Sequence, residues 1–209
     1  MGVLHGVTRL KFHEGELEDS KLLPAQCLQL SAELTATMAD GRGQRWVYLP
    51  MWGPPSKMVM FRRTNGDAPH GSIMAFQIAT DGDAPRLVPT WVSRDLSVPD
   101  PPVVANGIVY GISTGENTLQ RRTDPRYQEL YRKPGQTSPP SAVMMTGEER
   151  SQHTSHVTLY AFDAETGEAL YSSKDVIDDW THMSTVTVAD GTVYVTTRQS
   201  YVYAFGLKK

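Results

Sequence analysis

Three short segments of the sequence share one pattern of residue types: Ile73-Met-Ala-Phe-Gln-Ile78, Leu159-Tyr-Ala-Phe-Asp-Ala164 and Val202-Tyr-Ala-Phe-Gly-Leu207. The alanines of the last two segments are 43 residues apart, and those of the first two are 86 residues apart, which is twice that interval. A four-stranded blade of a β-propeller takes about 40–45 residues. The spacing therefore predicts an all-β protein built from antiparallel four-stranded blades.

A second marker recurs between runs of apolar or β-branched residues, as Ala39-Asp-Gly41, Ala105-Asn-Gly107 and Ala189-Asp-Gly191. Asp-Gly and Asn-Gly favour tight hairpins, because both residues of such a turn adopt positive φ angles. Each copy therefore predicts a hairpin between the first two strands of a blade.

The chain is expected to be a single partial propeller domain, 1–209. Its expected parts are the outer two strands of one blade at 5–29, a blade at 30–97, a blade at 98–175 and three strands of a closing blade at 180–207. The strand over residues 7–12 would then be the third strand of the first partial blade. A long insertion at 115–155 is expected to contain a short helix over 124–134. A β-sandwich or an open meander is the alternative fold.

The stretch from Tyr160 to Tyr171, Tyr-Ala-Phe-Asp-Ala-Glu-Thr-Gly-Glu-Ala-Leu-Tyr, resembles the PQQ-like (quinoprotein-like) repeat. In this motif we expect Asp163 and Thr166 to bond the turn backbone and Gly167 to adopt the left-handed conformation. Tyr171 would pack between blades where the family usually has tryptophan, and Trp91 occupies the matching position in the preceding blade.

The resemblance implies a ring of roughly six to eight blades, of which this chain holds about half. The expected partners are therefore missing upstream blades or another protein chain, and the full-length protein would be periplasmic or secreted. The formal net charge of −3 argues against a general nucleic-acid binder, which needs a basic face. No stretch approaches the ~18 apolar residues of a membrane-spanning helix.

Quinoprotein dehydrogenases with this repeat share a vicinal cysteine pair over the quinone, a stacking tryptophan and a calcium site of Glu, Asn and Asp. Cys27 is the only cysteine, so this chain cannot form that pair. Glu116 and Asn117 could ligate calcium, although a Thr-Gly-Glu-Asn loop is more often a turn. The leading expectation is a non-catalytic binding or scaffold module without a cofactor. The alternative is a fragment of a PQQ- and calcium-dependent dehydrogenase.

The segment Asp178-Asp-Trp-Thr-His-Met183 is the first candidate site, because it links two blades near the mouth of the expected central channel. Asp178, Asp179, Trp180 and His182 combine acidic groups, an aromatic surface and a titratable imidazole. Such a set could bind a small polar ligand or act as acid and base. The alternative is an inter-blade turn with a packing tryptophan.

Histidines recur five residues before the alanine of the Ala-Phe motif, at His70 and His156. Equivalent positions on different blades are too far apart to share one metal ion. We therefore expect these imidazoles to donate to loop carbonyls at the start of the third strands, and we keep His70 as a further ligand-binding candidate.

Overall fold

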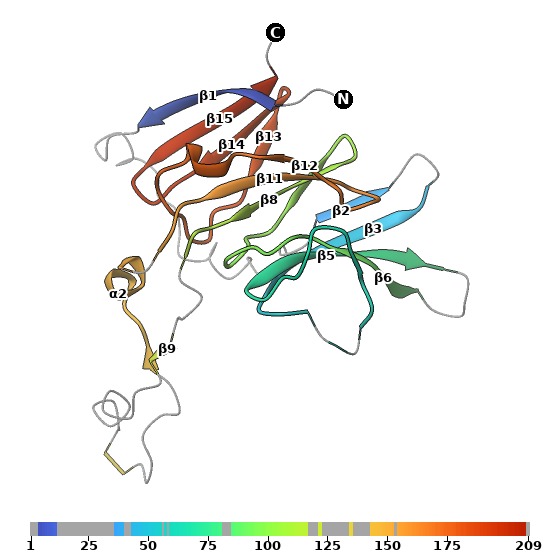
Figure 1. The fold of residues 1–209 in the computed structure, drawn as a ribbon, viewed down its shortest axis with the longest axis horizontal. Helices are drawn as coiled ribbons and strands as arrows, with labels where there is room; N and C mark the ends of the chain where they lie inside the picture. Colours follow the sequence, from blue (N-terminus) through green and yellow to red (C-terminus); the bar gives the residue numbers. More distant parts are fainter. Residues whose placement is uncertain are drawn as a thin grey trace.

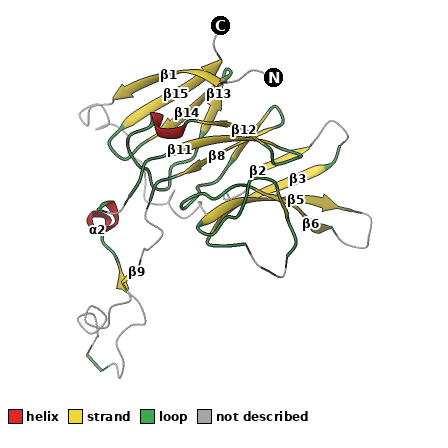
Figure 2. Ribbon diagram, in the orientation of Figure 1, coloured by secondary structure: helices red, strands yellow, loops and turns green. Residues whose placement is uncertain are grey.

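The computed structural model describes residues 4–11, 36–39, 43–55, 57, 59–80, 85–116, 121–122, 134–135, 143–152 and 154–207. These residues are mostly strand, and they form several antiparallel sheets (Figures 1 and 2). The expectation of an all-β chain is confirmed at this level. In the described part of the chain, no helix is long and apolar enough to cross a membrane.

The first sheet has the strand order β2-β3-β5-β6-β4. Its strands are β2 (Ala36–Ala39), β3 (Arg45–Trp52), β5 (Gly71–Ala79), β6 (Arg86–Val92) and β4 (Arg62–Arg63). The first four form an antiparallel meander, and β4 adds to the outer edge of β6 in parallel.

The middle and last sheets repeat the antiparallel meander (Figure 1). The middle sheet contains β7 (Val103–Ala105), β8 (Ile108–Ser113), β11 (Thr158–Asp163) and β12 (Ala169–Ser172). The last sheet contains β13 (Thr187–Ala189), β14 (Thr192–Thr196), β15 (Tyr201–Leu207) and β1 (Leu4–Lys11). Smaller elements are β9 (Arg121–Arg122), β10 (Val143–Met144), α2 (Gly147–Ser151) and the 3-10 helix η3 (Lys174–Val176).

Two of the three expected hairpins are confirmed by their turn geometry. Asn106 and Gly107 have φ angles of 52° and 74° between β7 and β8, and Asp190 and Gly191 have φ angles of 48° and 71° between β13 and β14. Positive φ at both central residues is the signature of the type I′ turn. In the third copy, Ala39-Asp-Gly41, the turn residues Asp40 and Gly41 lie outside the described residues, but the flanking strands β2 and β3 pair antiparallel as expected.

The strand β1 corrects the expected first partial blade. We expect residues 7–12 to form the third strand of a separate blade. Instead, β1 pairs antiparallel with β15 and forms one edge of the last sheet, while β13 forms the other edge (Figure 1). The physical reason is that β15 presents backbone donors and acceptors along its outer edge, and β1 satisfies them. Residues 12–29 of that expected blade lie outside the described residues.

Two insertions, expected from the sequence at 50–69 and 115–155, leave the sheets between second and third strands. A backbone hydrogen bond joins the two ends of each insertion. Gly53 N donates to His70 O at 2.8 Å in the first, and Ser155 N donates to Gly115 O at 2.7 Å in the second. The first insertion also follows the outer edge of its sheet, because it supplies β4. The expected helix over 124–134 falls almost entirely on residues outside the described part of the chain.

The middle sheet is buried on both faces. One face carries Tyr110, Ile112, Leu159 and Ala161 against Val193, Val195, Tyr203 and Phe205 of the last sheet. The other face carries Val109, Tyr160 and Phe162 against Trp46, Tyr48, Ile73, Ala75 and Trp91 of the first sheet. Alternate side chains of a strand point to opposite faces, so β8 and β11 contribute to both clusters. This packing fixes the three sheets in succession.

The motif 160–171 has the local structure expected for it. Asp163 Oδ1 accepts hydrogen bonds from the backbone N–H groups of Glu165 and Thr166 and from Thr166 Oγ1, and Gly167 has a φ of 74°. The ring centroids of Tyr171 and Phe205 lie 6.3 Å apart in an edge-to-face contact, which places Tyr171 between the middle and last sheets.

Trp91 has the matching role between the first and middle sheets. Its Nε1 donates to Ala164 O at 2.9 Å, and a Cβ atom added to Gly167 would lie 2.5 Å from its indole. The absence of a side chain at residue 167 therefore allows the tryptophan to close against the turn.

We predict that Gly167→Ala destabilises the protein more than Gly191→Ala. Both positions have positive φ, so each alanine strains the backbone by about 1–2 kcal/mol. Only residue 167 meets the indole of Trp91, since a Cβ at Gly191 meets nothing within 4 Å. Displacing the ring adds about 1–3 kcal/mol. Urea unfolding of both variants measures the difference, and equal losses would contradict the contact between the sheets.

Candidate functional site

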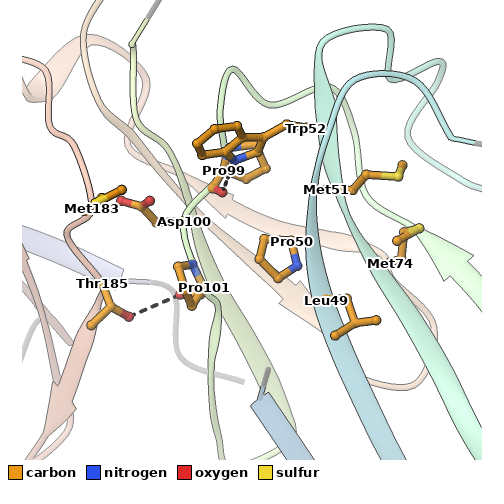
Figure 3. A pocket seen from close by; sticks show the side chains of 10 residues that line it. All are labelled: Leu49, Pro50, Met51, Trp52, Met74, Pro99, Asp100, Pro101, Met183 and Thr185. Atoms are coloured by element: carbon orange, nitrogen blue, oxygen red, sulfur yellow. Dashed lines mark hydrogen bonds between the residues drawn. The ribbon is translucent and has the colours of Figure 1, made fainter. Parts of the chain in front are cut away.

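A pocket of about 590 Å³ lies beside the first sheet, at the linkers that lead into the middle and last sheets (Figure 3). A volume of this size is typical of small-molecule sites. Its lining is mainly apolar and consists of Leu49, Pro50, Met51, Trp52, Met74, Pro99, Asp100, Pro101, Met183 and Thr185.

Three chain segments supply nine of the ten lining residues, and Met74 of β5 supplies the tenth. The first is the end of β3, residues 49–52, which continues beyond the part of β3 that pairs with β2. The other two are the linkers 99–101 and 183–185, which precede β7 and β13. Trp52 Nε1 donates to Pro99 O at 3.1 Å, and Thr185 Oγ1 donates to Pro101 O at 3.1 Å. These two bonds join all three segments.

The prolines of the lining keep this wall apolar. Pro50, Pro99 and Pro101 have no backbone N–H, so they bring no donor that would need a partner. Two of their carbonyls, those of Pro99 and Pro101, accept the bonds from Trp52 and Thr185 described above. The pocket wall is therefore mainly carbon and sulfur.

Asp100 is the one ionisable residue among the described residues of the lining, and it is only 4 % exposed. Its Oδ2 accepts a hydrogen bond from Ser184 N at 2.8 Å. Burial raises the pKa of this carboxyl to about 6. The hydrogen bond from Ser184 and the nearby His182 act in the opposite direction and lower the pKa, while Glu116 raises it.

His182 and Glu116 form a pair next to Asp100. The His182 Nδ1 lies 2.6 Å from Glu116 Oε2, and the Glu116 side chain is fully buried. Thr114 joins the loop after β8, which carries Glu116, to the linker that carries His182. Its carbonyl accepts from Thr181 N at 3.0 Å, and its Oγ1 accepts from Glu116 N at 3.2 Å. The sequence analysis singled out both His182 and Glu116 but did not pair them.

The other candidates of the 178–183 segment lie elsewhere, and none of them lines the pocket. Asp178 Oδ1 accepts from Tyr203 Oη at 2.7 Å. Asp179 is buried and accepts from the backbone N–H groups of Trp180 and Gln199, each at 2.8 Å. These contacts anchor the linker to the last sheet.

Trp180 is largely buried, with 9 % of its surface exposed. The guanidinium carbon of Arg198 lies 5.7 Å from its ring centroid, and Trp180 O accepts from Arg198 N at 2.8 Å. This is the geometry of an inter-sheet turn with a packing tryptophan.

His70 pairs with a carboxylate, whereas a loop carbonyl was expected. Its Nδ1 lies 2.7 Å from Asp95 Oδ2, and its backbone N–H donates to Asp95 Oδ1 at 2.8 Å. His156 has the same kind of partner, since its Nε2 lies 3.2 Å from Asp175 Oδ1. Each aspartate follows the fourth strand of its sheet, and each histidine precedes the third strand. The pairs therefore join the end of the fourth strand to the start of the third.

Asn117, the remaining candidate, lies outside the described residues. Among the residues that the structure does describe, no group of three or more His, Cys, Asp or Glu could hold a metal ion. Asp100 and the apolar wall were not predicted from the sequence. The signal available for Asp100 was its place in the proline-rich linker Val98-Pro-Asp-Pro-Pro102.

No protein-family model and no curated protein matches this chain.

We predict that Asp100→Asn stabilises the protein increasingly as the pH rises from about 4 to above 6. The asparagine keeps an acceptor for Ser184 N but cannot ionise. Between the ordinary pKa of 3.8 and the raised value of about 6, the folded wild type retains a proton that the unfolded chain loses. Wild-type stability therefore falls relative to the variant across this window, by about 3 kcal/mol in total.

Urea unfolding at several pH values measures this difference. Asp95→Asn is the matched control, because Asp95 lies in the same connection between the first and middle sheets but does not line the pocket. A gap between Asp100→Asn and wild type that stays constant with pH would contradict the buried position of this carboxyl.

Proposed function

We propose that this chain is a segment of a β-propeller related to the PQQ-like family and that it acts as a non-catalytic binding module. In this proposal the first, middle and last sheets are successive blades. The observation that supports the blade assignment is a set of contacts that recurs at equivalent positions in two of the sheets.

The first recurring contact is a serine that follows the fourth strand. Ser93 Oγ accepts from Ile73 N and Ser173 Oγ accepts from Leu159 N, each at 2.9 Å. Both bonds join the start of the third strand to the end of the fourth.

The second recurring contact is the histidine–aspartate pair, and the third is the aromatic residue of the fourth strand. The pairs are His70–Asp95 and His156–Asp175. Trp91 and Tyr171 are each directly opposite the alanine of the Ala-Phe motif on the neighbouring strand. Repetition of side-chain roles, and not only of strands, is characteristic of a repeat protein.

We predict that Ser93→Ala and Ser173→Ala destabilise the protein by similar amounts. Each change leaves one buried backbone N–H, of Ile73 or Leu159, without its acceptor, at a cost of about 1–3 kcal/mol. Thermal unfolding of the two variants measures the loss. Thr90→Ala serves as a control, because Thr90 Oγ1 bonds only the nearby Val88 O. A large loss in one serine variant and none in the other would count against equivalent blades.

The pocket is the single observation that supports the binding function. It has the volume of a small-molecule site, it is formed where the first sheet meets the linkers 99–101 and 183–185, and its lining is mainly apolar. The polar residues of the 178–183 segment led us to expect a small polar ligand in this region. The lining favours instead a molecule with a substantial apolar part.

The quinone-dependent alternative has no specific observation in its favour. One of its two candidate calcium ligands, Asn117, lies outside the described residues, and the other, Glu116, pairs with His182.

Phenylbutanol, a neutral molecule with an apolar body, is a suitable probe of the pocket. We predict that it binds the wild-type protein and that Leu49→Asn weakens its affinity about tenfold, because the change replaces an apolar wall by an amide. Val47→Asn is the matched control: residue 47 lies on the same face of β3 and is also half-buried, but it does not line the pocket.

Isothermal titration calorimetry measures both affinities, and the unfolding midpoints show that both variants fold. Absence of phenylbutanol binding to the wild type, or equal losses in the two variants, would contradict binding in this pocket.

A further inference from the structure

The lining of the pocket combines a single acid with soft, polarisable groups. Among the ten lining residues that the structure describes, Asp100 is the ionisable one, and none of the ten is a lysine or an arginine. Three methionines, Met51, Met74 and Met183, and Trp52 also line the pocket (Figure 3). An indole face attracts cations, and a thioether is polarisable. When Asp100 is ionised, its carboxylate gives the described lining a negative charge.

The carboxylate of Asp100 is poorly compensated for a group at this depth. Within the described part of the chain it receives one hydrogen bond, from Ser184 N to Oδ2. A carboxylate that ionises away from water needs a counter-charge or several donors. Figure 3 shows the carboxylate on the same side of the pocket as Met183. A positively charged ligand group in the pocket would supply the missing counter-charge.

The neighbouring charged groups do not replace such a ligand. His182 and Glu116 are the two ionisable residues that act on Asp100. The Nδ1 of His182 is engaged by Glu116 Oε2 at 2.6 Å, and Glu116 itself adds negative charge. The three side chains together thus hold two carboxyl groups and one imidazole, so the cluster can accept a further cation.

We propose that the pocket binds an organic cation composed of an apolar body and a primary ammonium group, with the ammonium donating a hydrogen bond to the Asp100 carboxylate. This inference rests on the proposed binding function and names the chemical class of ligand. The apolar body occupies the wall formed by Leu49, Met51 and Met74. The ammonium group lies between Asp100 and the Met183 thioether.

Three probes that differ only in their polar end test this assignment: phenylbutylammonium, phenylbutanol and phenylbutanoate. At about pH 8 Asp100 is ionised. We expect phenylbutylammonium to bind at least about tenfold more tightly than phenylbutanol, and phenylbutanoate to bind more weakly than either. Calorimetry in low-salt buffer measures all three affinities.

Asp100→Asn separates charge recognition from apolar binding. We expect this variant to bind phenylbutylammonium no more tightly than phenylbutanol, because the amide that replaces the carboxylate carries no charge. The control Asp95→Asn removes an acid outside the pocket and should keep the full preference for the ammonium. Lowering the pH from about 8 to about 5 protonates Asp100 in the wild type and should abolish the preference in the same way.

The outcomes distinguish this inference from the proposed function. Equal affinity of the wild type for the ammonium and the alcohol would overturn the inference and leave the apolar binding function standing. A preference for the ammonium that persists in Asp100→Asn would also overturn it, because the cation would then be bound elsewhere. Failure of all three probes to bind would overturn both proposals.

Discussion

The contact between Trp91 and the turn at Gly167 determines how the first sheet sits on the middle sheet. The indole Nε1 donates to Ala164 O at 2.9 Å, the hydroxyl of Tyr48 donates to the same carbonyl at 3.0 Å, and the ring lies where a Cβ of residue 167 would be. One buried carbonyl therefore receives two donors from the neighbouring sheet. Burial of these large aromatic surfaces stabilises the contact, while the two hydrogen bonds fix its geometry.

The pocket depends on this arrangement, because its walls come from the first sheet and from the linkers that lead into the other two sheets. The end of β3 supplies one wall, and the linkers 99–101 and 183–185 supply the others. Each linker is fastened by few bonds, such as Ser184 N to Asp100 and Thr185 Oγ1 to Pro101 O. A shift of the first sheet against the middle sheet would move β3 away from both linkers. The rigidity of the inter-sheet core is therefore a condition for a preformed site.

Local sequence signals predicted local structure well. The Asn106-Gly107 and Asp190-Gly191 turns and the bonds of Asp163 follow from backbone requirements that a few adjacent residues satisfy. Contacts between distant segments were not predictable in this way. The pairing of His182 with Glu116, the burial of Asp100 and the partner of β1 all depend on how sheets pack, and no short motif encodes them. The acidic residues Asp178 and Asp179 illustrate the same limit, since their roles in anchoring the linker depend on Tyr203 and Gln199.

The pairing of β1 with β15 has a consequence for how the chain folds. Leu4 lies opposite Leu207, so the last sheet joins segments that are separated by nearly the whole sequence. Contacts of such large separation are slow to form, because the loop between them must close first. During synthesis on the ribosome, the residues of β1 emerge long before those of β15, so they cannot form this pairing until β15 has been made. The first and middle sheets can form as soon as their own residues have emerged, whereas the last sheet is completed only after β15 has been made.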